Sequence, residues 1–402
     1  MKENEVCKVV LVTGGAGFIG SNFLEYFCKK YPQYRVVNLD KLTYAGNLDN
    51  LKECSSLQNY VFVKGDICDN DFVSKVFDDY KITDVIHFAA ESHVDNSIKN
   101  PRAFVETNVL GTFTLLENFR KYSCNSSRAC DSNGNPGRFH HISTDEVYGT
   151  LGKDGYFTET TPYAPNSPYS ASKASSDMLV RSYFHTYGVN IITTNCSNNY
   201  GPKQHQEKLM PTVIRTALSE QPVPIYGDGQ NIRDWLYVTD HCKAVDLVFH
   251  KGRSGETYNI GGNNERNNIE IATKICEILD KKRPRTCGES YKELITFVKD
   301  RPGHDRRYAI DSTKLSSELG WKPEETFESG ITKTVEWYLR DSFRNSFRNS
   351  TQNSNQNSRR NSFPNSRCNS LSNSCRNFPQ DSVRNFSQSS EETSDIPTIK
   401  EE

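Results

Sequence analysis

The chain has 402 residues, 35% of them hydrophobic, which is enough to bury one large core or two moderate ones. Its 49 basic and 50 acidic residues nearly cancel, so the chain has no overall basic field that would bind nucleic acid or an anionic membrane surface. The first residues, MKENEVCKVV, lack the pattern of a secretion signal, and no apolar run approaches the roughly 20 residues of a membrane span, so we expect a cytoplasmic protein.

Strand-like and helix-like segments alternate in the first half of the chain. Runs rich in Val, Ile and Leu occupy residues 8–12, 34–39 and 83–90, and helix-length stretches such as 19–30 separate them. This alternation is typical of a parallel sheet covered by helices on both faces. We predict an α/β fold in which a Rossmann-type doubly wound parallel sheet spans residues 1–190.

The alternation loosens beyond about residue 190. Residues 301–305 (RPGHD) lie in a loop that no regular element explains. We predict a smaller α/β C-terminal domain over 191–340, with a segment near 232–262 that returns to the first sheet. From Ser342 the composition changes to Asn, Ser and Arg, which is typical of disorder, so we predict a disordered tail over 341–402.

A glycine-rich turn follows the first predicted strand. The run VTGGAGFIGSN places Gly14, Gly17 and Gly20 where a tight turn, close approach of a pyrophosphate and close helix packing need glycine. Asp40 ends the second strand 20 residues after Gly20, where a carboxylate can bind the ribose hydroxyls of a dinucleotide. The pattern predicts a site that prefers NAD, because Asp40 repels the extra phosphate of NADP, while neighbouring Lys41 weakens that preference. The alternative is a glycine-rich turn without a ligand.

Three acidic residues at strand ends each have two possible uses. Asp66, in GDI, is predicted to lie beside the adenine, and its alternative is to cap the following helix. Asp145 and Glu146, in ISTDEVYG, follow a predicted strand and serve either solvation or chemistry. Their own composition does not decide between these uses.

Tyr169 and Lys173 stand four residues apart in the helical run SPYSASKASSD, so their side chains share one face. A phenol with a pKa near 10 is a poor base, and a nearby ammonium lowers that pKa. The pair is therefore predicted to remove a proton from a sugar hydroxyl as hydride leaves for NAD. The alternative is an ordinary surface pair on a helix.

Several blocks occur in one register between about Lys8 and Arg340: TGGAGFIGSN, DKLTYAGNL, AAESHVD, HHISTDEVYG, YAPNSPYSASKASSD, NCSNNYGP, EKLMP, IRDWLYV and DRPGHDRRYAID. With these blocks the chain resembles the extended short-chain dehydrogenases and, among them, the dTDP-glucose 4,6-dehydratases. The match of many blocks in one register is far more specific than any single motif.

The resemblance implies conversion of dTDP-D-glucose to dTDP-4-keto-6-deoxy-D-glucose and water, with no net redox change. Tyr169, supported by Lys173, would remove the proton of the C4 hydroxyl while the C4 hydride passes to NAD. Glu146 would then take the C5 proton, Asp145 would protonate the leaving C6 hydroxyl, and the hydride would return to C6. Thr144 completes the implied catalytic set.

The adjacent acids pose a geometric problem. Two close carboxyl groups in a partly dry site split their pKa values, so one holds a proton while its neighbour is ionised. Successive strand residues point to opposite faces, however. The backbone at 144–147 must therefore leave strand geometry if Asp145 and Glu146 are to meet one sugar.

The resemblance also implies two sets of binding residues. The cofactor set comprises Gly14, Gly17, Phe18, Ile19, Gly20, Asp40, Lys41, Leu42, Thr43, Asp66, Ile67, Ala89, Ala90, Ser92, Thr107, Tyr169 and Lys173. The set for the sugar and its nucleoside diphosphate comprises Ser92, Thr144, Asn198, Glu207, Lys208, Leu209, Pro224, Tyr226, Arg233, Asn268, Arg301 and His304. For the arginines, the alternative is a solvated or salt-bridged role.

No metal site is expected. The twelve cysteines include no Cys-x-x-Cys pair, which argues against a zinc site and a disulfide framework. His140 and His141 have no further ligand cluster beside them, so we predict that they pack in the strand before the site.

Four other functions share part of this pattern. A decarboxylase of the same extended family would share NAD, Tyr169 and Lys173. A UDP-glucose 4,6-dehydratase would carry the same acid pair, whereas family 4-epimerases carry small uncharged residues where this chain has Asp145 and Glu146. A non-catalytic NAD-binding scaffold would be expected to lack one of the catalytic groups, and all are present here. The family resemblance further implies a homodimer.

Overall fold

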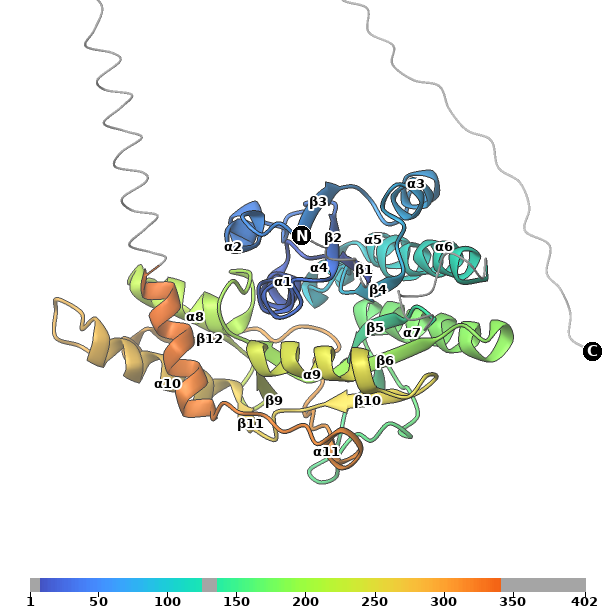
Figure 1. Cartoon of the computed structure of the whole chain (residues 1–402). Helices are drawn as coiled ribbons and strands as arrows, with labels where there is room; N and C mark the ends of the chain where they lie inside the picture. The colour runs from blue at the N-terminus through green and yellow to red at the C-terminus, as the bar shows by residue number, and fades with distance from the viewer. Residues whose placement is uncertain (1–7, 125–135, 341–402) are drawn as a thin grey trace, which may run out of the picture. The chain divides into compact units, whose positions relative to one another are not determined.

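The main sheet of the computed structural model is parallel and lies between two layers of helices (Figure 1). The structure describes residues 8–124 and 136–340, so the predicted tail lies outside the described residues. Within these ranges seven strands pair in the order β10-β6-β5-β4-β1-β2-β3. Their bounds are β1 Val9–Thr13, β2 Arg35–Asp40, β3 Tyr60–Lys64, β4 Asp84–His87, β5 Phe139–Thr144, β6 Ile191–Cys196 and β10 Thr257–Ile260.

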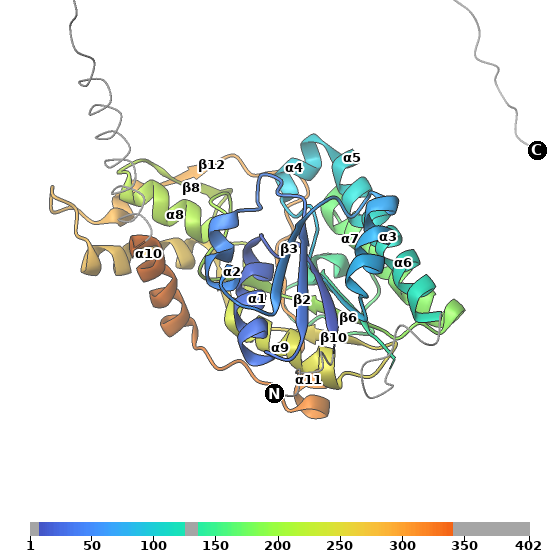
Figure 2. The same ribbon diagram turned by 45° about the horizontal axis from the view of Figure 1, so that its top comes forward.

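Helices cover both faces of this sheet, as Figures 1 and 2 show. One layer contains α1 (Phe18–Lys30), α2 (Lys52–Ser55) and α9 (Val238–Lys251), and the other contains α3 (Asn70–Tyr80), α6 (Thr112–Cys124) and α7 (Pro168–Tyr187). Along β1, Val10 and Val12 pack in the core of the first layer and Leu11 in that of the second. Because both faces are buried, the strand is apolar from Val9 to Val12. The predicted doubly wound α/β fold is confirmed.

Two smaller sheets form beside the main one. The first pairs β11 (Glu265–Asn267), β9 (Ile232–Tyr237) and β7 (Asn198–Tyr200), and the second pairs β12 (Ile295–Val298) with β8 (Val223–Tyr226). Helices α8 (Leu209–Leu218), α10 (Asn268–Lys282) and 327–340 share an apolar core with them. We call residues 197–237 and 261–308 the small lobe. Strand β6 belongs to the main sheet although it follows residue 190, and the chain returns to that sheet through α9 and β10.

Short helices occupy the connections. They are η1 (Leu48–Leu51), α4 (Val94–Lys99), α5 (Pro101–Phe104), the π-helix η2 (Val105–Gly111), the 3₁₀ turns η3 (Asp145–Tyr148) and η4 (Tyr291–Leu294), and α11 (Thr313–Leu319). None of the helices in 8–124 and 136–340 is long and apolar enough to cross a membrane.

All strands of the main sheet point the same way, so their carboxyl ends meet at one edge. Thr13, Asp40, His87, Thr144 and Cys196 end five of them. The strand order reverses between β1 and β4, which is where ligands bind in open parallel sheets. The fold therefore points to this edge as the functional site.

Candidate active site

The glycine-rich turn joins β1 to α1 and leaves no room for a side chain at Gly14 or Gly20. Gly14 has φ +73° and a Cβ there would lie 2.6 Å from the backbone N and Cα of Ala89. A Cβ at Gly20 would lie 2.4 Å from the carbonyl oxygen of Gly14. Helix α1 has Gly17 as its N-cap with no side-chain cap, which leaves its N-terminal N–H groups available for a phosphate. This cradle fits a dinucleotide.

Asp40 holds the turn from the end of β2. Its Oδ2 accepts a hydrogen bond from the Ala16 N–H and its Oδ1 one from the Leu42 N–H, both at 2.8 Å. Burial raises the pKa of the Asp40 carboxyl, and these two N–H groups oppose that rise. Asp40 thus supports the loop in addition to its predicted contact with ribose.

Lys41 is paired with Asp66 rather than free beside Asp40. Its Nζ lies 2.6 Å from Asp66 Oδ2, and the Cys68 N–H donates to Asp66 Oδ1 at 3.0 Å. The cap of α3 is Asp69, which accepts from the Phe72 N–H at 3.0 Å. The capping alternative for Asp66 is therefore wrong.

The other predicted cofactor residues follow the carboxyl ends of β1 to β4 or lie near them. Phe18 and Ile19 open α1, Leu42 and Thr43 follow β2, Ile67 follows β3, Ala89, Ala90 and Ser92 follow β4, and Thr107 lies in the π-helix η2. The sequence did not single out Asn108, next to Thr107. Its amide exchanges two hydrogen bonds with the Glu91 backbone, at 2.9 and 3.0 Å, and donates to Ser172 Oγ at 2.8 Å. A π-helix has no clear sequence signal that would reveal this bridge.

The acid pair leaves strand geometry where β5 ends. Thr144 is extended and caps the 3₁₀ turn η3, and its Oγ1 accepts from the Glu146 N–H at 3.3 Å. Successive residues of a 3₁₀ turn lie about 120° apart around the axis instead of alternating between opposite faces. This local turn removes the obstacle that a continued strand would pose for Asp145 and Glu146.

The two acids have different electrostatic surroundings. Burial raises the pKa of Asp145 well above its ordinary value, and the charges of Glu146 and Asp234 raise it further. Burial also raises the pKa of Glu146, but three cations oppose that rise, namely Arg301, Lys208 and Arg233. When the two carboxyl groups hold a single proton, that proton therefore favours Asp145, and the negative charge favours Glu146.

Tyr169 and Lys173 lie in the first two turns of α7, where Ser167 and Ser170 form a capping box. Both side chains are buried, and Lys173 Nζ donates to the Ile142 carbonyl at 2.9 Å. Burial and the Glu146 charge raise the pKa of Tyr169 well above its ordinary value, opposite to the lowering that the sequence led us to expect. In the folded chain by itself, desolvation of the Tyr169 phenol therefore outweighs any lowering of its pKa by the Lys173 ammonium.

Cations of the small lobe reach toward the acid pair. Lys208 Nζ donates to the Ser92 carbonyl at 2.9 Å. Arg233 donates to the Ile232 and Asp305 carbonyls at 2.7 and 2.8 Å, and its guanidinium lies 4.2 Å from the ring centre of Tyr308. The alternative of a solvated or salt-bridged arginine does not describe Arg233, which is 5% exposed and bonds neutral carbonyls.

Asp95, in the AAESHVD block, links two predicted substrate residues. It pairs with Arg301 Nη1 at 3.3 Å and accepts from the Tyr226 hydroxyl at 3.2 Å. The rings of His304 and Tyr226 form a T-shaped pair, with 6.3 Å between their centres. Asp95 lies in the AAESHVD motif, but the sequence pattern predicted no role for it.

The remaining predicted substrate residues lie at several element ends. Glu207 accepts from the Tyr44 hydroxyl at 3.3 Å, which links the loop after β2 to the small lobe. Leu209 opens α8, Pro224 lies in β8, Asn198 opens β7 and Asn268 opens α10.

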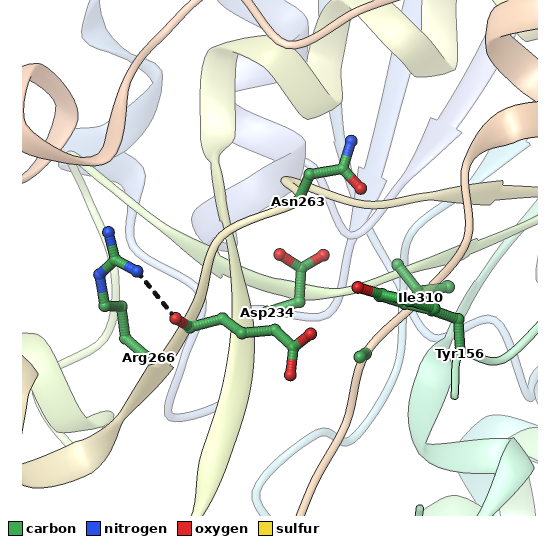
Figure 3. Close-up of a pocket in the computed structure, with 7 residues that line it drawn as sticks. Tyr156, Asp234, Asn263, Arg266 and Ile310 are labelled. Carbon is green, nitrogen blue, oxygen red and sulfur yellow. Dashed lines mark hydrogen bonds between the residues drawn. The ribbon is translucent and has the colours of Figure 1, made fainter. Parts of the chain in front are cut away.

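A pocket of about 240 Å³ lies beside the small sheet (Figure 3). Its lining residues are Tyr156, Asp234, Asn263, Glu265, Arg266, Ala309 and Ile310. Asp234 follows Arg233 in β9, so the two point to opposite faces of the strand. Asp234 binds the Gly262 and Asn264 N–H groups at 2.8 and 2.6 Å. This carboxylate therefore anchors the 262–264 loop, and its charge also raises the pKa of Asp145.

The described residues contain no group of three or more His, Cys, Asp and Glu side chains that could hold a metal ion. His140 and His141 are fully buried, with hydrogen bonds to Thr194 and Asp177.

Fold and site together define an NAD-linked enzyme of the extended short-chain dehydrogenase type, and comparison with known proteins names the family. The family model described as GDP-mannose 4,6 dehydratase matches residues 11–334. The dTDP-glucose 4,6-dehydratase of Xanthomonas campestris pv. campestris (strain B100) is 57% identical over 329 residues, covering 82% of this chain and 92% of the relative. The Salmonella typhimurium dTDP-glucose 4,6-dehydratase is 56% identical over 342 residues, covering 83% and 93%. This chain belongs to the GDP-mannose 4,6 dehydratase family and, within it, to the dTDP-glucose 4,6-dehydratases.

Solved structures agree with this assignment. A Bacillus anthracis dTDP-glucose 4,6-dehydratase in complex with NAD has a TM-score of 0.72 at 48% identity, covering 83% of this chain and 97% of its own. A Streptomyces venezuelae dTDP-glucose 4,6-dehydratase with NAD and TYD bound has a TM-score of 0.74 at 42% identity, with the same coverage. A Thermus thermophilus UDP-glucose 4-epimerase in complex with NAD has a TM-score of 0.71 but only 29% identity, covering 82% and 99%.

Gly20→Ala should weaken NAD binding and lower the melting temperature, because its Cβ would lie 2.4 Å from the Gly14 carbonyl oxygen. Overpacking of this kind costs about 1–3 kcal/mol. Gly152→Ala is the matched control, since a Cβ there meets nothing within 4 Å. Calorimetric titration with NAD and thermal unfolding would measure both effects, and equal behaviour of the two variants would contradict the cradle.

Proposed function

We propose that this chain converts dTDP-D-glucose to dTDP-4-keto-6-deoxy-D-glucose and water, with NAD as its cofactor. The observation that carries the proposal is the acid pair at the end of β5, in which three cations oppose the effect of burial on the pKa of Glu146, whereas the charge of Glu146 adds to the effect of burial on the pKa of Asp145. An elimination needs a base and an acid at neighbouring carbons, and the pair supplies both. Relatives at 56–57% identity are named for this activity.

Each catalytic residue has a defined task in this proposal. Bound NAD supplies the capacity to accept a hydride from C4 and to return it to C6. Tyr169 takes the proton of the C4 hydroxyl, and Lys173 lowers the cost of its phenolate. Glu146 takes the C5 proton, which the adjacent C4 ketone makes acidic. Burial raises the pKa of Asp145, which favours its protonated form, and Asp145 donates that proton to the leaving C6 hydroxyl.

The cofactor and substrate would occupy different parts of the chain. The glycine turn, Asp40 and the segments after β3 and β4 would hold NAD in the domain of the main sheet. The small lobe, with Lys208, Arg233 and Arg301, would hold the nucleoside diphosphate, since guanidinium groups bind phosphate oxygens through paired, charge-assisted hydrogen bonds. A cytoplasmic location is part of the same proposal.

Purified protein should convert dTDP-glucose without added reductant, and mass spectrometry should show the loss of one water. Assays of dTDP-glucose and UDP-glucose side by side, at equal concentrations, would test which nucleobase of the substrate the site prefers. Faster turnover of UDP-glucose would favour the UDP-glucose dehydratase alternative. Formation of only the galactose epimer would refute the dehydratase proposal.

Glu146→Gln should lower the rate of solvent deuterium exchange into C5 by at least about 100-fold, because loss of a general base costs about 10²–10⁴ in rate. The variant should still permit reduction of bound NAD. Asp145→Asn is the paired variant, and it should retain C5 exchange but lose water elimination. Absorbance of NADH and mass spectrometry of the sugar separate the two steps. Wild-type C5 exchange in the Gln variant would show that another group is the base.

We further propose that the chain forms a homodimer through the helical layer of α4 to α7. Large apolar side chains are 40–52% exposed on these helices: Ile98, Val105, Leu110, Phe113, Met178 and Tyr187. Exposed apolar patches of this kind mark association sites. A second copy of the chain is the partner that the family resemblance suggests.

Light scattering should give a dimer mass for the wild type and a monomer mass for the double variant Leu110→Asp, Phe113→Asp. Phe297→Asp is the matched control, since Phe297 is 57% exposed in β12, outside this layer. A double variant that stays dimeric would place the interface elsewhere.

A further inference from the structure

Asp177 lies one helical turn beyond Lys173 in α7 and is 4% exposed. Its Oδ2 accepts hydrogen bonds from Ser143 Oγ at 2.7 Å and from the Tyr163 hydroxyl at 3.0 Å. Its Oδ1 lies 3.0 Å from His141 Nε2. Three donors that converge on one carboxyl group fit its ionised form, which only accepts hydrogen bonds.

His141 contributes a hydrogen bond but no charge. Burial and the charge of Lys173 lower the pKa of His141 well below its ordinary value, so the ring is neutral. A neutral imidazole carries one N–H, and within the described residues Nδ1 has no hydrogen-bond partner. The proton therefore belongs on Nε2, where it is donated to Asp177, and the negative charge of Asp177 remains uncompensated by this ring.

Asp177 and Lys173 dock on neighbouring residues of one strand. Lys173 Nζ donates to the carbonyl of Ile142, and Asp177 accepts from the side chain of the next residue, Ser143. Burial lowers the pKa of the Lys173 ammonium, and the charge of Asp177 raises it. The carbonyl orients the ammonium, but only a negative charge offsets the cost of burying it.

The other titratable groups that face this pair are neutral. Burial lowers the pKa of His87 in β4 well below its ordinary value and raises that of the Cys196 thiol in β6 to about 12. Burial also raises the pKa values of Tyr148 and Tyr163, which precede α7. Together with neutral His141, these groups leave Asp177 as the anion that balances Lys173.

We propose that Asp177 is a positioning residue that keeps Lys173 protonated inside the site and so sustains Tyr169 as a base. The inference about Tyr169 rests on the proposed function, whereas the state of Lys173 does not. Burial raises the pKa of Asp177 to about 6, with Lys173 opposing that rise, so the carboxylate is present at neutral pH and is lost as the pH falls through that value.

The direct test is the titration of Lys173 by NMR of protein labelled with ¹³C at the lysine ε carbons, with Lys173→Arg to assign the signal. Asp177→Asn should lower the pKa of Lys173 by at least about one unit, because a neutral amide no longer balances the ammonium. Asp177→Glu, which keeps the charge, should restore most of the shift. An unchanged Lys173 pKa in the Asn variant would overturn the proposal.

Asp246→Asn is the matched control. Asp246 is 2% exposed in α9 and accepts from Tyr26, Lys30 and Tyr31 at 2.8, 2.6 and 3.3 Å. Both Asn variants should lower the melting temperature, since each removes a buried carboxylate from its donors. Only Asp177→Asn should move the titration of Lys173, and an equal movement in Asp246→Asn would reduce the effect to general destabilisation.

A second readout is the pH profile of NADH formation in a single turnover with dTDP-glucose. The alkaline limb should move to lower pH by about one unit in Asp177→Asn and not in Asp246→Asn. Failure of the wild type to convert dTDP-glucose would refute the proposed function and leave the NMR comparison to judge Asp177. If Asp177→Asn does not fold, the wild-type titration decides: an ammonium at pH 8 supports the proposal, and a neutral amine there overturns it.

Discussion

The cost of removing charged side chains from water is the physical constraint that governs the site at the carboxyl end of β5. Asp145, Lys173 and Asp177 are each less than 5% exposed, and a buried charge without a partner costs several kcal/mol. The structure meets this constraint in two ways. The raised pKa of Asp145 favours its neutral form, whereas Asp177 accepts hydrogen bonds from three donors that favour its ionised form. Burial of these groups costs folding free energy. It also affects their protonation states, because it favours the neutral form of Asp145, and the Asp177 carboxylate then favours the ammonium form of Lys173.

The parallel sheet decides which residues share this environment. Strands β1 to β6 deliver their carboxyl ends to one edge, so the glycine turn, Asp40, the loop after β4 and the acid pair meet although they are far apart in sequence. Helix α7 then crosses β5 and brings Tyr169 and Lys173 to the same edge through the Lys173 bond to Ile142. The chemistry follows from the order of the strands, because a different order would separate these groups.

The small lobe completes the site with positive charge. Lys208, Arg233 and Arg301 come from three separate segments, and all three lower the pKa of Glu146 against the effect of burial. They do so while engaged with the Ser92 and Asp305 carbonyls and with Asp95. If these cations bind the diphosphate and Glu146 is the base, as proposed above, the same charges would serve substrate recognition and favour the ionised form of Glu146.

Local sequence determined much of this protein. Buried apolar runs predicted the doubly wound sheet, the spacing of Gly14, Gly17, Gly20 and Asp40 predicted a dinucleotide turn, and the i, i+4 spacing of Tyr169 and Lys173 placed them on one helical face. These features depend on interactions between residues that are close together in the chain, so the sequence pattern predicts them. The resemblance supplied the roles of Asp145 and Glu146.

Only the tertiary structure decided the protonation states and the second layer of contacts. The Lys41–Asp66 pair, the bridge made by Asn108 and the acceptor role of Asp177 depend on neighbours that arrive from distant segments. The sequence led us to expect a lowered pKa for Tyr169, whereas burial raises it. Desolvation depends on how completely the folded chain surrounds a group, and that quantity is a property of the packed molecule rather than of any motif.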